Sequence, residues 1–377
     1  MHVPDGFLDA KTAIATGAMA LAGLGVALRQ ARISLPPRRV PLLGLSAAFV
    51  FAAQMLNFPV AGGTSGHLIG AVLTAALLGP SAAVIVLSAV LIVQCFMFAD
   101  GGVTALGANV FNMAIIGGVG GWAVYYAVSR MVSGPFGRVL AATFAAWFST
   151  VLAAIACAGE LAVSHTVAWR AAFPAMAGVH LLIGIGEGII TALVLAAIGK
   201  ARPDLLGLAE APEPRGFEVV MPESAATETG RPGEPISQGS EDMSEYRQHG
   251  RDAHATRVRR PLVSSGTAGT PIRPVHREGV VSLVAFGLLI SLGLALFVAP
   301  FACSWPDGLD KTAQALGFEH HAREKPLLPA PLPEYKIPWI GSERVATSVA
   351  GAAGTVLVFG LAWVLARVLV PGKKSEI

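Results

Sequence analysis

Long apolar runs constrain the fold of this chain more than any other feature of its sequence. Most are about 18 to 26 residues long, enough for a helix to cross a hydrocarbon layer of roughly 30 Å. Lipid offers exposed backbone no hydrogen-bond partners, so such segments must be helical. The runs are 8–28, 40–57, 67–79, 81–98, 103–128, 138–159, 172–198, 279–300 and 345–370. The sequence predicts an all-α polytopic membrane protein that has the lipid bilayer as its surroundings.

The composition agrees with this class. Only 14% of the residues are charged, whereas a soluble domain carries about a quarter, and the mean hydropathy is +0.62. We attribute the net charge of +3 to lysine and arginine on the cytoplasmic side, so no nucleic-acid partner is expected. The three cysteines form no zinc-type pattern.

The runs divide the chain into modules. Seven of them lie in 1–200, which predicts a seven-helix membrane module. The stretch 201–278 is rich in Pro, Glu, Arg, Ser and Gly and is predicted to be a disordered cytoplasmic linker. Residues 279–370 are predicted to form a two-helix module that holds a polar extracytoplasmic loop, 301–343, and residues 371–377 a cytoplasmic tail. This organisation resembles two subunits fused into one chain.

The charges around the first run predict its orientation. Asp5 and Asp9 precede the run and arginines follow it, the reverse of a cleaved signal peptide. The positive-inside bias therefore places the N-terminus outside the membrane and the C-terminus inside.

The third run is short and is preceded by the glycine-rich stretch 62–66. Non-helical backbone at membrane depth must line a cavity or be buried in protein, so this stretch is a candidate binding loop. The alternative is an exposed loop between two helices.

The first residues could bind a metal ion. The amine of Met1, the backbone nitrogen of His2 and one imidazole nitrogen of His2 lie close along the chain and can close two fused chelate rings. Planar nitrogen coordination is typical of Ni(II) and Cu(II). His67, where the glycine-rich loop enters the membrane, could supply the fourth nitrogen. The alternative for His2 is a histidine placed there by chance.

Other polar residues stand in apolar surroundings. They could orient the ligands or could form hydrogen bonds between helices; they are Asn57, Ser65, Gln94 and Asn109. His180 and Glu187 share one helix face but lie about 10 Å apart along its axis. That spacing argues against a shared ion, and hence against a membrane metalloenzyme, and favours a buried polar pair.

The sequence contains no GxxxxGK[ST] phosphate loop, no Gly-x-Ser-x-Gly elbow and no His-Glu-x-x-His pair. The chain therefore cannot bind ATP through the usual phosphate cradle. If transport is driven by ATP, the ATPase must be another chain.

Several motifs, in order along 1–200, resemble the NikM/CbiM family, the substrate-binding components of energy-coupling-factor (ECF) transporters for nickel and cobalt. The motifs are Met1–Asp9, Gln54–Pro59, Gly62–His67, Phe98–Gly102 and the stretch 180–187. The resemblance implies a metal plane formed by the Met1 amine, His2 and His67. It also implies a bacterial inner-membrane location and an ECF transmembrane coupling subunit and ATPase in separate chains. The resemblance further implies a transporter component rather than an enzyme, with the ion as cargo and no cofactor. Asp5 is expected to be structural.

The stretch Ser304–Asp310 resembles the PDGLE-type domain of NikN, an accessory component of nickel systems. Pro306, Asp307, Gly308 and Leu309 match the motif, and Asp310 stands where the family has glutamate. The resemblance implies that this module assists metal loading, and its fusion to the first module, as in NikMN proteins, favours nickel. His320 and His321 are expected to be a solvated surface pair.

Three further hypotheses remain at this point: cobalt uptake for cobalamin synthesis by the same scaffold, an ion-coupled secondary transporter acting alone and, ranked last, a membrane metalloenzyme.

Overall fold

The computed structural model describes residues 2–202, 205, 277–323 and 325–370. Met1, nearly all of the predicted linker and the predicted C-terminal tail lie outside the described residues, so the disorder predicted for the linker is not tested.

The prediction of an all-helical membrane fold is confirmed. The first module contains α1 (Ala10–Ser34), α2 (Val40–Gln54), α3 (Ala71–Leu78), α4 (Pro80–Phe98), α7 (Gly134–Val163) and α8 (Trp169–Ala201). Between α4 and α7, a helical stretch runs through α5 (Leu106–Asn109), the π-helical η2 (Val110–Gly120) and α6 (Gly121–Ser129). A short antiparallel hairpin, β1 (Phe58–Val60) and β2 (Thr64–Gly66), precedes α3. The short turn η1 (Pro37–Arg39) joins α1 to α2.

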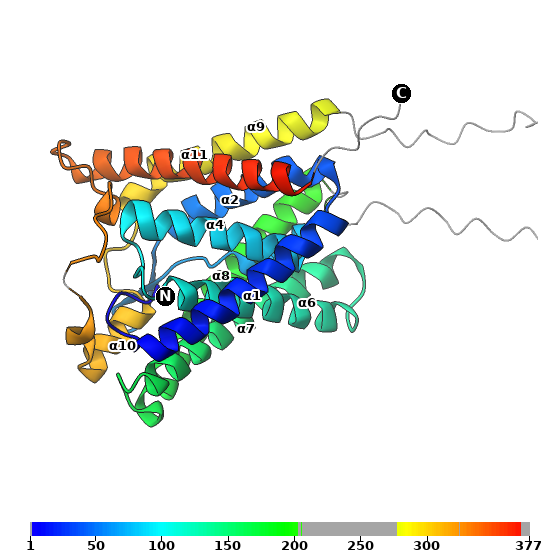
Figure 1. Ribbon diagram of the computed structural model, residues 1–377. Coiled ribbons are helices and arrows are strands. Elements are labelled where there is room, and N and C mark those ends of the chain that lie inside the picture. Colours follow the sequence, from blue (N-terminus) through cyan, green and yellow to red (C-terminus); the bar gives the residue numbers. More distant parts are fainter. Residues whose placement is uncertain (1, 203–204, 206–276, 324, 371–377) are drawn as a thin grey trace, which may run out of the picture. The chain divides into compact units, whose positions relative to one another are not determined.

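The second module begins with α9 (Arg277–Gly293), followed by the turns η4 (Leu294–Val298) and η5 (Ala299–Phe301). The short helix α10 (Gly308–Leu316) comes next, then η6 (Glu319–His321) and η7 (Pro333–Tyr335), and the long helix α11 (Glu343–Leu369) ends the module. Figure 1 shows α9 and α11 alongside the first module, whereas α10 lies at the end of the helices where the chain begins. We call this the site end.

Seven helices in the described part of the chain are long and apolar enough to cross a membrane. Two of the nine predicted runs are shorter: α2 has 15 residues and α3 has 8. A helix the length of α3 spans only about 12 Å, so the third run does not cross a bilayer as a helix. The backbone explains the break, because Gly70 and Gly79 flank α3 with φ of +75° and +92°, a region that favours glycine. Pro80 then starts α4.

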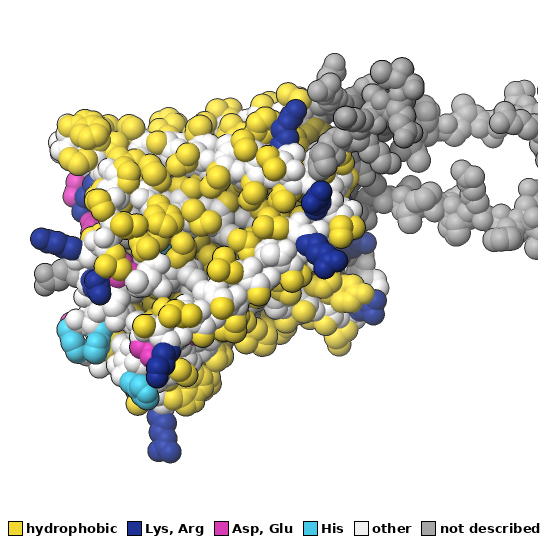
Figure 2. Space-filling view, in the orientation of Figure 1, with side chains coloured by type: hydrophobic (Ala, Val, Ile, Leu, Met, Phe, Trp, Pro, Cys, Tyr) yellow, Lys and Arg dark blue, Asp and Glu magenta, His cyan; other side chains and the backbone are white. Residues whose placement is uncertain are grey.

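The sides of the helices carry many exposed apolar side chains. Figure 2 shows them as a broad yellow surface between the two ends. Ile14 and Leu21 on α1, Leu193 on α8 and Val356 on α11 are all more than half exposed. Apolar exposure of this extent is expected where lipid, rather than water, is the solvent.

The second module packs closely on the first. Helix α11 lies against α2 and α4, and the approach uses glycines on both sides. A Cβ on Gly44 of α2 would lie 3.0 Å from the carbonyl oxygen of Phe359, and one on Gly354 of α11 would overlap the ring of Phe51. Small residues of this kind let helices in a membrane approach closely. Within the described residues, the two modules therefore share one packed interior.

This packing predicts the effect of a larger side chain on α11. Gly354→Leu should force α11 away from Phe51 and reduce stability by about 1–3 kcal/mol, as overpacking does. Gly360→Leu is the matched control, since a Cβ at Gly360 has nothing within 4 Å and both changes improve helix propensity equally. The thermal unfolding midpoint of the purified protein in detergent measures the difference. Equal midpoints for the two variants would contradict the packing.

Candidate metal site

The glycine-rich loop is the β1–β2 hairpin, in which Phe58 pairs with Gly66. Its tip is exposed, but Thr64 to His67 are buried. The hairpin packs on α8, where a Cβ on Gly66 would lie 2.6 Å from Cγ2 of Ile183. The alternative of a merely exposed loop is therefore wrong for the segment that leads into His67.

Glu187 of α8 fixes the chain directly after His67. Its two carboxylate oxygens accept hydrogen bonds from the backbone N–H groups of Ile69, at 2.6 Å, and Gly70, at 2.9 Å. His180, about two turns earlier on the same helix, instead bonds through Nδ1 to the carbonyl oxygen of Met176, at 2.8 Å. Both residues are buried, as expected, but they have separate partners. Glu187 serves to hold the loop rather than to pair with His180.

His2 and His67 lie together. Their ring centroids are 5.1 Å apart, and the two ring planes differ by 15°. Burial lowers the pKa of His2, although Asp100 opposes the effect, and burial lowers the pKa of His67 well below its usual value. Neutral imidazoles are the form that binds a metal ion. The structure thus places two of the predicted ligands, 65 positions apart in the sequence, side by side in a form suited to coordination.

The two nitrogens of His2 have different surroundings. Nδ1 lies 3.2 Å from Oδ1 of Asp100, while Nε2 is buried on the other side of the ring. Since a neutral imidazole carries one proton and the carboxylate can only accept, the proton belongs on Nδ1.

Asn109 and Asp5 hold the N-terminal segment before α1 in place. The side chain of Asn109 accepts from the Val3 backbone N–H at 2.8 Å and donates to the Val3 carbonyl oxygen at 3.2 Å. Oδ1 of Asp5 accepts from the backbone N–H of Thr104 at 2.8 Å and from its hydroxyl at 2.6 Å. Asn109 therefore orients the segment that carries His2, and Asp5 has the structural position expected of it.

The other polar residues act at different places. Gln94 donates to Gln54 at 2.9 Å, and Gln54 donates to the Ile69 carbonyl oxygen at 2.9 Å, so this pair supports the loop next to His67. The Ser65 hydroxyl donates to the Trp305 carbonyl oxygen at 2.7 Å, in the second module. Asn57 accepts, through its backbone carbonyl oxygen, from the N–H of Cys303 at 2.8 Å.

The PDGLE-like motif covers this loop. The Ser65 backbone N–H donates to the Pro306 carbonyl oxygen at 2.9 Å. Asp307 caps α10 by accepting from the N–H groups of Leu309 and Asp310, at 2.8 and 2.9 Å. Leu309 itself is fully buried. The motif residues thus have two tasks, to start α10 and to seat it on the hairpin.

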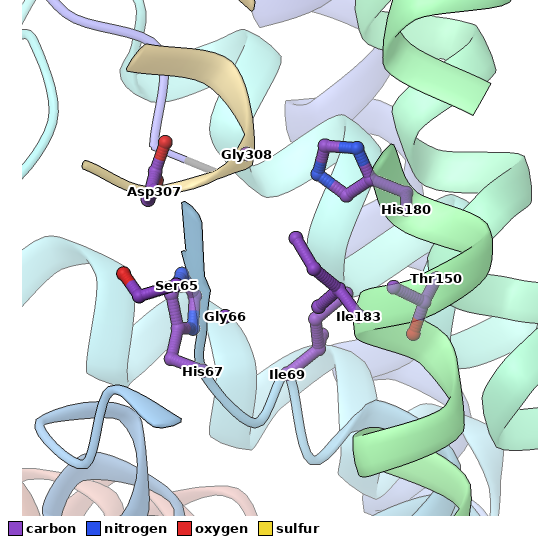
Figure 3. Close-up of a pocket in the computed structure, with 9 residues that line it drawn as sticks. All are labelled: Ser65, Gly66, His67, Ile69, Thr150, His180, Ile183, Asp307 and Gly308. Carbon is purple, nitrogen blue, oxygen red and sulfur yellow. The ribbon is translucent and has the colours of Figure 1, made fainter. Parts of the chain in front are cut away.

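A cavity of about 10 Å³ separates the motif from the loop and α8, and Figure 3 shows His67 on one side, His180 on another and Gly308 above. It is lined by Ser65, Gly66, His67, Ile69, Thr150, His180, Ile183, Asp307 and Gly308. Nε2 of His180 is buried and has no partner among the described residues. The cavity is close to the smallest size that holds one water molecule.

Charge is concentrated around the same point. Burial by itself would raise the pKa of Asp307, but the positive charge of the amino terminus lowers it well below its usual range. Burial, and then the charge of Asp307, raise the pKa of Asp310 to about 6. The carboxylate of Asp307 thus remains charged beside the two histidines, where it favours a cation.

Gly308, the glycine of the PDGLE-like motif, has no room for a side chain. A Cβ on Gly308 would lie 2.7 Å from Cε1 of His180 and 2.8 Å from Cδ1 of Ile183. Gly308→Ala should therefore lift the segment around Cys303 from the hairpin and raise the rate at which a water-soluble maleimide labels Cys303, since Cys95 and Cys157 are buried. Gly341→Ala, which has nothing within 4 Å, should label like the wild type. An unchanged rate for Gly308→Ala would refute the seating of the motif.

Comparison with known proteins identifies the family. Residues 2–205 match the family model "Cobalt uptake substrate-specific transmembrane region" (CbiM). The chain belongs to this family. Residues 281–370 match the PDGLE domain model.

Among the relatives, the "Putative fused nickel transport protein NikMN" of Archaeoglobus fulgidus is 31% identical over 97% of this chain and 98% of its own length. The "Fused nickel transport protein NikMN" of Rhodobacter capsulatus is 38% identical over 56% of this chain and 65% of its own. The "Cobalt transport protein CbiM 1" of Pelobacter propionicus is 32% identical over 55% of this chain and 94% of its own. The relatives are metal transport proteins and not enzymes. This CbiM-family chain is thus a multi-pass membrane protein of a nickel and cobalt transport family.

His320 and His321 lie on the surface, as predicted. Two residues that bear on the site had no assigned role from the sequence. Asp100 stands in the family-like stretch Phe98–Gly102, which could have marked it as a candidate. Tyr335, whose hydroxyl donates to Oδ2 of Asp100 at 2.8 Å, lies in a polar segment of the second module that matches no motif we recognised.

Proposed function

We propose that this protein binds Ni²⁺ as the substrate-binding component of an ECF-type importer, with the ion held by the Met1 amine, His2 and His67. The observation that carries the proposal is the buried contact between the neutral rings of His2 and His67. His2, at the second position of the chain, lies next to the buried imidazole of His67. The N-terminal residues and His67 can therefore both supply nitrogen ligands to one ion.

The described side chains supply too few ligands for a metal ion, which favours coordination by backbone nitrogen as well. No group of three or more His, Cys, Asp or Glu side chains in the described ranges is placed to hold a metal ion. Two imidazoles alone leave half of a planar site unfilled, and the amine and the His2 amide nitrogen are the groups nearest along the chain. Such a nitrogen plane favours Ni(II).

The ring of His2 must turn for this chelate to form. Only Nδ1 can close a small chelate ring with the amide nitrogen of the same residue, because Nε2 lies on the far side of the imidazole. In the structure, Nδ1 faces Asp100. The ion therefore displaces the hydrogen bond between His2 and Asp100 when it binds.

Separate chains supply the energy for transport, and the site faces the outer side of the membrane. The sequence contains no phosphate-binding loop, so the ATPase and the transmembrane coupling subunit are separate chains. Basic residues occupy the ends of α1 and α8 opposite the site end, at Arg29, Arg32 and Lys200, and by the positive-inside bias they support a site end that faces outward. The ion then enters from the outer side of a bacterial inner membrane.

Cobalt is the second candidate, because the family includes cobalt transport proteins such as the one from Pelobacter propionicus. Competition between Ni²⁺ and Co²⁺ for the purified protein separates the two candidates. A planar four-nitrogen site binds Ni²⁺ in preference, and a preference for Co²⁺ would support cobalt as the cargo.

The N-terminal site predicts a sharp effect of chain extension. A short extension before Met1 converts the amine into an amide and should abolish tight Ni²⁺ binding, measured by calorimetry, while the unfolding midpoint stays unchanged. His67→Ala should weaken binding by more than the 10- to 100-fold that is typical when a group behind a metal ligand is lost. His320→Ala, at an exposed histidine, is the control and should bind as the wild type does. Unimpaired binding by the extended chain would refute the site.

A further inference from the structure

The second module reaches His2 through a chain of hydrogen bonds. The hydroxyl of Tyr335 donates to Oδ2 of Asp100 at 2.8 Å, and Oδ1 of the same carboxylate lies 3.2 Å from Nδ1 of His2. One carboxylate therefore joins the two modules, since Tyr335 and Asp100 are 235 positions apart.

Both ends of this connection are held firmly. The ring of Tyr335 stacks on Phe98, with centroids 4.5 Å apart and planes 17° apart. The backbone N–H of Leu332 donates to the Met97 carbonyl oxygen at 2.9 Å. Asp100 directly follows α4, and its backbone N–H donates to the Gln94 carbonyl oxygen at 3.1 Å. Tyr335 and Asp100 are thus positioned by the end of α4, next to the N-terminal segment.

The Tyr335 hydroxyl acts as a donor. Burial raises the pKa of Tyr335 well above its usual value, and the nearby charge of Asp100 raises it further. The phenol keeps its proton, and both oxygens of Asp100 have a donor. A carboxylate fixed in this way is a better-aimed acceptor for Nδ1 of His2 than one that is free to rotate.

We infer that Tyr335 is a positioning residue that, through Asp100, holds His2 in the metal-free orientation, so that this one contact of the second module opposes metal binding. The inference rests on the proposed function, in which Nδ1 of His2 must leave Asp100 to bind the ion. Whatever stabilises the bond between His2 and Asp100 therefore competes with the metal. Because coupling between two binding equilibria is reciprocal, bound metal also weakens the docking of the segment that carries Tyr335.

The role of Tyr335 is more specific than that of simply covering the site end. Segment 302–342 touches the site end at several other points: the Arg323 N–H donates to the Asp5 carbonyl oxygen at 2.9 Å, and Phe318 packs edge-on against Phe7. Those contacts do not involve a proposed ligand. The contact made by Tyr335, in contrast, passes through a single carboxylate to the nitrogen that the ion needs.

Tyr335→Phe tests the inference in the full-length protein. It removes the hydroxyl and keeps the ring that stacks on Phe98. We expect Ni²⁺ to bind about 2- to 10-fold more tightly by calorimetry, the range that one hydrogen bond supports. A purely structural role for Tyr335 would loosen the site and weaken binding, so the sign of the change distinguishes the two roles. Lys336→Met, which removes only the exposed ion pair with Glu334, should leave the affinity unchanged.

A double-mutant cycle locates the effect. In an Asp100→Ala background, Tyr335→Phe should no longer change the affinity, because the group through which it acts is gone. Weaker or unchanged binding by Tyr335→Phe, or tighter binding that persists without Asp100, would overturn the inference. The N-terminally extended protein separates this failure from that of the proposed function: if it still binds Ni²⁺ tightly, the proposed site is wrong, and if only the Tyr335 result fails, the site stands.

Discussion

The burial of two uncharged imidazoles next to each other is the arrangement on which the rest of this structure depends. His2 lies at the start of the chain, and His67 lies in a loop between two helices, so neither position is set by a continuous helix. Polar groups at such depth are costly unless they have partners. Asn109 is the hydrogen-bond partner for the N-terminal segment, and Glu187 is the partner for the loop after His67. The long helices supply the rigid frame from which both groups project.

The second module contributes to the same arrangement. Its α11 packs on α2 and α4 through glycines, and its polar segment lies over the hairpin at Ser65 and along the end of α4 at Met97. The PDGLE-like motif thus touches the loop that leads into His67, and Tyr335 touches the carboxylate next to His2. A module that reaches both proposed ligands is well placed to influence when the ion enters and leaves.

The sequence was sufficient to predict the class, the apolar segments, the family and the pair of histidines. Membrane spans are predictable because length and hydropathy alone define them, and α3 was marked as unusual by Gly79 and Pro80. The finer assignments were less predictable, since they depend on distances between segments remote in the sequence. Glu187 was expected to pair with His180 and instead fastens the loop backbone. Tyr335 sits in a segment with no periodic pattern, and only the fold brings its hydroxyl to Asp100.

The planar nitrogen coordination of Ni²⁺ by the N-terminus, His2 and His67 is tested most directly by X-ray absorption at the nickel edge of the loaded protein. We predict a planar shell of four nitrogens, of which two belong to imidazoles. A six-coordinate shell of oxygen and nitrogen, a sulfur ligand or a single imidazole would contradict it.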